Sequence, residues 1–242
     1  MPSSTLDILY RFTLSDGKKR DFQVRLDRAS LRLLAHPRER WPDWTKLSFM
    51  QCPNCPLEEG SHPRCPVAAN LTDIVEEFKD FTSTEKALIE IVSETRTTSR
   101  HSTLAEGLSS LIGIYMTTSG CPHLDKLRPN VLQHLPFATA EETLFRTFAM
   151  YLLAQFLQER RGGKPDWKLE RFKEMIDAVC VVNRKFCERL YGTCIKDVHV
   201  NAVVHLNCFA EISVGALSPR SKRLDELAQA FEAYLPEDIT ID

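Results

Sequence analysis

Alternating apolar and polar positions near the N-terminus predict a β-hairpin. Apolar residues recur at every second position from Leu6 to Leu14 and again from Phe22 to Leu26. An Asp-Gly dipeptide, which is typical of a tight hairpin turn, lies between the two runs. A later β-rich run from Ala87 to Thr98 predicts a third strand that joins this hairpin.

Helical spacing of apolar residues dominates the rest of the chain. Threonine followed three residues later by glutamate forms a capping box, which predicts helix starts at Thr103 and at Thr139. Six helical segments are expected: Pro66 to Phe78, Leu104 to Ser119, Leu144 to Leu157, Asp166 to Leu190, Val198 to Leu217 and Ser221 to Leu235.

One of these helices has a polar residue on its apolar seam. Asn183 falls among apolar residues spaced three and four apart between Asp166 and Leu190. A buried amide without a partner costs about 1 to 3 kcal/mol. We therefore expect Asn183 to be buried and hydrogen-bonded to a polar neighbour, with His205 the first candidate.

The combined pattern predicts an α+β fold. A small antiparallel sheet, made from the N-terminal hairpin and one later strand, is expected to pack with a metal-stapled loop on a mainly helical C-terminal bundle. At 242 residues the chain can bury one good core, so we predict a single domain, 1–242. Residues 1–100 would supply the sheet and the cysteine-rich loop, and residues 101–242 the bundle.

Composition limits the cellular locations and the classes of partner that we expect for this protein. Hydrophobic residues make up 43% of the chain and charged residues 26%, as in ordinary globular proteins, and the net charge of -2 argues against nucleic acid as a partner. No apolar run approaches the ~20 residues of a membrane span, and Met1 to Asp7 lack the features of a signal peptide. We expect a cytoplasmic protein with no membrane partner.

Basic residues gather around the predicted hairpin, from Lys18 to Arg32. Such charges suit either an anionic partner or the protection of an edge strand from pairing with another chain, and the second role is the commoner one.

The most informative chemistry lies in a proline-rich stretch before the first predicted helix. It contains Cys-Pro-Asn-Cys-Pro-Leu from Cys52 to Leu57 and His-Pro-Arg-Cys-Pro from His62 to Pro66. Two cysteines in Cys-x-x-Cys can chelate one tetrahedral ion, and proline holds the residue before it in an extended or turn geometry. The Cys-Pro-x-Cys form resembles the metal-binding loops of rubredoxins and zinc ribbons. The stretch therefore predicts a metal site.

The eight cysteines fall into two groups, according to whether a proline directly follows. Four directly precede a proline, and we predict that they bind one metal ion: Cys52, Cys55, Cys65 and Cys121. His62 and His123 are alternatives for the fourth ligand. The other four resemble small core residues: Cys180, Cys187, Cys194 and Cys208.

Zinc and an iron-sulfur cluster both use four thiolates, and the knuckle form favours zinc. Redox-active or unliganded loop cysteines are the alternative. A thioredoxin-type pair is expected between a strand and a helix in a βαβ unit, which this proline-rich stretch does not provide.

Taken together, these motifs resemble a bacterial protein family of unknown function. The resemblance spans nearly the whole chain and depends on four segments: Cys52 to Leu57, Cys65 to Leu71, Met116 to Pro122 and His134 to Thr139. It implies a bacterial source and a single-unit architecture, and it implies no activity.

Three functions compete on this sequence. The first is a non-enzymatic recognition or regulatory module with a structural four-cysteine zinc-type site, which implies a protein partner. The second is an iron-sulfur redox or sensor protein. The third is an enzyme with a cleft near the metal, lined by His123, His134, Glu142 and Arg146. The sequence contains no phosphate loop, dinucleotide fingerprint or nucleophile triad.

Overall fold

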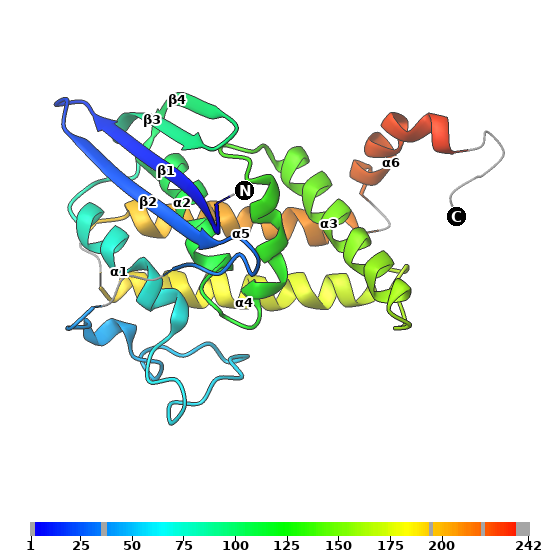
Figure 1. Cartoon of the computed structure of the whole chain (residues 1–242), viewed down its shortest axis with the longest axis horizontal. Coiled ribbons are helices and arrows are strands. Elements are labelled where there is room, and N and C mark those ends of the chain that lie inside the picture. Colours follow the sequence, from blue (N-terminus) through cyan, green and yellow to red (C-terminus); the bar gives the residue numbers. More distant parts are fainter. Residues whose placement is uncertain (1–2, 35–37, 194–195, 219–220, 236–242) are drawn as a thin grey trace.

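The structure is a computed structural model that describes residues 3–34, 38–193, 196–218 and 221–235. A four-stranded antiparallel sheet lies against a set of helices, two of which, α4 (Glu170–Tyr191) and α5 (Val198–Ala216), yellow and orange in Figure 1, run side by side. The predicted α+β class is confirmed.

The sheet has the strand order β2-β1-β3-β4, with every pair antiparallel. The strands span Thr5–Leu14 (β1), Lys19–Asp27 (β2), Lys86–Ser93 (β3) and Thr97–Thr103 (β4). In β1 the side chains of Ile8, Tyr10 and Phe12 are buried while their neighbours are more exposed. The alternation in the sequence therefore marks the face that packs on the helices.

One strand was not predicted. The run from Ala87 to Thr98 was interpreted as a single strand, but the chain turns after Ser93, whose N–H donates to Arg96 O at 2.9 Å, and returns as β4. Strand β4 is a polar edge strand in which only Ser102 is buried. An edge strand with so little buried surface needs no apolar alternation, so the pattern gave no signal.

Six α-helices and three short 3₁₀ helices are present in the described part of the chain. The α-helices are α1 (Pro66–Phe78), α2 (Leu104–Thr117), α3 (Ala140–Arg160), α4 (Glu170–Tyr191), α5 (Val198–Ala216) and α6 (Arg223–Ala228). The 3₁₀ helices are η1 (Asp43–Thr45), η2 (Leu124–Gln133) and η3 (Gln229–Tyr234).

The helix starts follow the capping signals. Thr139 and Glu142 form the complete capping box of α3, and Thr103 Oγ1 accepts a hydrogen bond from the Glu106 N–H at the start of α2. Helix α4 begins later than predicted. The carboxylate of Asp166 accepts from the N–H groups of the residues at positions 170 and 171, and Leu169 has a left-handed φ of 62°. Asp166 therefore caps α4 from outside it.

The sheet and helices meet through α1 and α2. Phe78 of α1 contacts the rings of Phe12 and Phe22, with centroids 5.3 and 5.6 Å apart. Gly107 of α2 lies so close to the sheet that an added Cβ would be 2.4 Å from Ile89 Cδ1. Because α2 crosses the sheet at such close range, any side chain at this position would displace Ile89 or Phe12.

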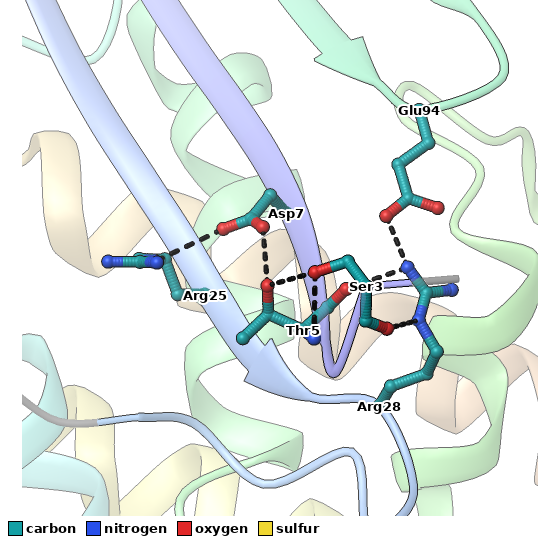
Figure 2. A network of polar contacts seen from close by, with 6 residues as sticks. All are labelled: Ser3, Thr5, Asp7, Arg25, Arg28 and Glu94. Carbon is teal, nitrogen blue, oxygen red and sulfur yellow. Dashed lines mark hydrogen bonds and ion pairs between the residues drawn. The ribbon is translucent and has the colours of Figure 1, made fainter. Parts of the chain in front are cut away.

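Most of the basic residues around the hairpin form ion pairs within the chain. Figure 2 shows Arg28 donating to the carbonyls of Ser3 and Thr5, at 2.7 and 2.6 Å, and pairing with Glu94 in the turn between β3 and β4. Four further ion pairs lie along the same stretch: Lys18 with Asp16, Arg20 with Glu77, Arg25 with Asp7 and Arg32 with Asp125. These contacts favour the edge-strand interpretation over an anion site.

A buried histidine links α5 to α1 and gives the fold a pH dependence. His199 has no exposed surface, its Nε2 lies 3.2 Å from Ile74 O, and burial lowers its pKa to about 4. The unfolded chain binds a proton at its ordinary pKa of about 6.5, which the folded chain does not. Stability is therefore complete above that pKa and falls as the pH is lowered toward 4.

We expect the free energy of unfolding to be about 2 kcal/mol smaller at pH 5 than at pH 7 through His199 alone. Urea unfolding at pH 7, 6 and 5 measures this change. The His199→Gln variant, which does not titrate there, should show a flatter profile. Identical pH profiles for variant and wild type would contradict the assignment.

Candidate functional site

The cysteine-rich loop, residues 38–65, connects β2 to α1 and lies beside α1 and α4 (Figure 1). Its last residue, Cys65, is the N-cap of α1 with an extended backbone, and Pro66 occupies the first turn. The Cys65 N–H donates to Thr45 O at 2.8 Å. These contacts hold Cys65 at the N-terminal end of a 13-residue helix, where the helix dipole favours negative charge.

The knuckle from Cys52 to Cys55 forms a tight turn in which the Cys55 N–H donates to Cys52 O at 3.0 Å. Asn54 anchors this turn twice. Its Nδ2 donates to Ala178 O of α4 at 3.1 Å, and its own carbonyl lies 2.6 Å from His123 Nε2. The knuckle is therefore attached to both α4 and the segment after α2.

Cys121 follows directly from the end of α2. The chain leaves the helix through Gly120, which has a φ of +89°, and Cys121 is 9% exposed. Burial raises the pKa of its thiol, whereas the backbone N–H groups of Leu124 and His123 act in the opposite direction. Donors directed at a sulfur stabilise its thiolate form.

The structure brings the four predicted cysteines into one neighbourhood. Burial raises the pKa of Cys52 to about 12, and the negative charges of Cys65, Cys121 and Cys55 act in the same direction. All four are free thiols. Within residues 3–34, 38–193, 196–218 and 221–235, however, no three His, Cys, Asp or Glu side chains are placed to hold a metal ion. The sulfurs are gathered but do not form a ligand set.

The two histidines proposed as alternative ligands have other contacts. His62 is exposed, and its Nδ1 lies 3.0 Å from Ser61 Oγ. His123 faces the Asn54 carbonyl through Nε2. This contact supports the knuckle.

A buried arginine that the sequence did not indicate lies beside the cysteines. Arg189 of α4 is 2% exposed and donates to the carbonyls of Trp44, Lys46 and Leu47 at 2.6, 2.9 and 3.4 Å. Burial lowers its pKa, and the charges of Cys65, Cys52 and Cys55 oppose that shift. In the described chain Arg189 has no ion pair with a carboxylate. Nothing in the local sequence distinguishes it from a surface arginine.

The other cysteines only partly match the expected core positions. Cys180 is buried and Cys187 half-buried, and burial raises the pKa of each to about 11. Cys208 is exposed, which corrects the prediction, because it occupies an outward-facing position of α5. Cys194 lies outside the described residues.

The residues of the enzyme hypothesis are separated in the structure. His134 and Arg146 line a partly open cavity of about 350 Å³ between α2, α3, α4, α5 and η2. Glu142 is occupied by the capping box, where Oε2 accepts from the Thr139 N–H at 2.8 Å, and His123 faces the knuckle. Only two of the four side chains share a site. Asn183 also lines this cavity; it is 3% exposed, as expected, but has no hydrogen bond to His205.

These features define an α+β protein whose cysteine-rich loop is attached to a helical layer through buried polar contacts. The chain belongs to the family described as a domain of unknown function, DUF6901, which matches residues 8–232. The predicted membership in an uncharacterised family is thus confirmed, although the match does not single out the cysteine motifs. Neither the curated proteins nor the solved structures contain a match. None of the helices in the described residues is long and apolar enough to cross a membrane.

Proposed function

We propose that Cys52, Cys55, Cys65 and Cys121 bind one structural zinc ion in a cytoplasmic recognition or regulatory module of bacterial origin. The observation that carries this proposal is the position of Arg189, a buried cation near Cys52, Cys55 and Cys65. Burying a charge without a partner costs several kcal/mol.

Metal binding supplies the missing negative charge. Zinc binds thiolates, so a site with four cysteines carries two net negative charges. Arg189 would offset part of this charge, and the thiolate site would serve as its anionic partner in place of a carboxylate. With four neutral thiols, by contrast, Arg189 would have no anionic partner, only three backbone carbonyls and the Phe49 ring, whose centroid is 5.7 Å from the guanidinium carbon.

The proposed ligands come from two separate parts of the chain. Three ligands belong to the loop and its junction with α1, and the fourth follows α2. Cys52, Cys55 and Cys65 are only half-buried, and the proposal requires their side chains to turn so that the sulfurs lie at the roughly 2.3 Å of a zinc-thiolate bond. The metal would then attach a loop with little regular structure to the helical layer.

A four-thiolate site has no open coordination position and therefore activates no water. This property favours a structural role over hydrolysis, as expected of a module that binds a protein partner. A reducing compartment such as the cytoplasm keeps the thiols available for the metal.

Elemental analysis and an absorption spectrum of anaerobically purified protein test the proposal. We expect one equivalent of zinc per chain and a colourless protein. A brown protein with absorbance at about 400 nm would indicate the iron-sulfur alternative. Protein with no bound metal, or with two equivalents, would contradict the proposed ligand set.

A further inference from the structure

The partly open cavity between the helices has the size and lining of a ligand site. Its volume of about 350 Å³ falls in the range of about 300 to 1,000 Å³ that is usual for small-molecule pockets. Apolar side chains from several helices form most of the wall, among them Ile114, Val131, Ile176 and Phe209. A few polar groups interrupt this wall, which is the arrangement that orients a bound ligand.

Arg146 of α3 is the main charged group at this wall. Its Nε is buried and has no hydrogen-bond acceptor, while its Nη1 donates to Gln133 O at 3.3 Å. Burial lowers the pKa of Arg146, and the charges of Glu142 and Tyr10 oppose this shift. In the described chain Arg146 forms no ion pair within 4.0 Å, and the Glu142 carboxylate is engaged at the start of α3. Arg146 therefore contributes a cation without a carboxylate partner to the wall of the cavity.

A neutral pair lies beside Arg146. Tyr10 OH, from the centre of the sheet, is 2.5 Å from His134 Nε2. Burial and the charge of Arg146 lower the pKa of His134 to about 3, and burial raises that of Tyr10. Because both groups stay uncharged near neutral pH, neither neutralises the arginine.

The remaining lining leaves the cavity with a positive balance. Arg100 lies over the Phe137 ring at 5.5 Å, and Glu106 is the one carboxylate in the wall. Asn183, almost fully buried, lines the same cavity and has no hydrogen-bond partner in the described chain. An anion can therefore bind with both charge and hydrogen-bond donors at hand.

We propose that this cavity binds a small apolar carboxylic acid, with Arg146 pairing with the carboxylate and the apolar wall enclosing the hydrocarbon part. The planar guanidinium matches a carboxylate in geometry. Asn183 supplies a further donor, and the surrounding Ile, Val and Phe side chains exclude a strongly hydrated ligand.

Calorimetric titration of the purified protein with octanoate and with 1-octanol tests the proposal. We expect octanoate to bind more tightly than octanol. Arg146→Met keeps the apolar stem and should lower octanoate affinity roughly tenfold or more, because a charge-assisted hydrogen bond is lost, while octanol binding should change little. Arg160→Met, at an exposed position of the same helix, is the matched control and should bind both compounds like wild type.

Ala210→Phe provides a test that does not alter charge. Ala210 is buried in α5 and lines the cavity, so a phenyl ring there should abolish binding of both compounds. If Arg146→Met does not fold, Arg146→Lys replaces it, with a smaller loss of octanoate affinity. Equal affinities of wild type for acid and alcohol, undiminished octanoate binding in either Arg146 variant, or full binding in Ala210→Phe would each overturn the proposal, as would the absence of octanoate binding at millimolar concentration.

Discussion

Replacing Cys121 with serine is expected to remove most of the bound metal and to release the cysteine-rich loop. Cys121 is the only proposed ligand outside the loop and its junction with α1, and it extends from the rigid end of α2. Structural zinc contributes about 10 kcal/mol or more to the folding of small metal-dependent segments. Elemental analysis should therefore show loss of zinc, and limited proteolysis should show faster cleavage within residues 50–66.

Cys187→Ser is the control for this experiment. Cys187 is half-buried in α4, with Sγ 3.9 Å from Val200 O, and belongs to no proposed ligand set. Its variant should keep the full metal content. His123→Ala should also keep one equivalent, with weaker affinity because the contact to the Asn54 carbonyl is lost. Full zinc occupancy in Cys121→Ser, with zinc lost instead in His123→Ala or His62→Ala, would replace the four-cysteine set with three cysteines and one histidine.

Replacing Arg189 with methionine is expected to lower the free energy of unfolding by about 3 to 5 kcal/mol, because three buried carbonyls lose a charged donor. The carbonyls belong to Trp44, Lys46 and Leu47, so the loss falls on the loop that carries the cysteines. Zinc affinity should fall roughly 10- to 100-fold, as is usual when a group that supports the ligands is removed. Urea unfolding and competition with a zinc chelator measure the two effects.

Arg184→Met, on the same helix, separates these effects from the general loss of an arginine. Arg184 is more than half exposed and lies 3.6 Å from Glu211. Exposed ion pairs of this kind contribute about 0 to 1 kcal/mol, so stability and zinc affinity should stay close to wild type. If Arg189→Met matched this control in zinc affinity, Arg189 would support the loop only, and the charge argument for a metal-thiolate site would fail.

The candidate sites differ in how far the sequence could predict them. Cysteines before proline marked a group that the structure does gather, because Cys-Pro turns and the helix start at Pro66 are local features. Arg189 and Tyr10 were missed, since a buried arginine or a tyrosine next to a histidine looks like any other until distant segments meet. The prediction that four residues line one cleft was wrong for the same reason. Glu142 and His123 are each held by a contact that removes them from the cavity.

The sequence by itself determined the α+β class, the N-terminal hairpin and the starts of α2 and α3. These depend on turn chemistry, capping and apolar spacing, which act within a few residues. Only the tertiary structure decided the polar strand β4, the outward position of Cys208 and the cavity between the helices. Each of these depends on which surfaces are covered by segments far away in the chain. The sequence pattern of one segment does not indicate which distant segments will pack against it.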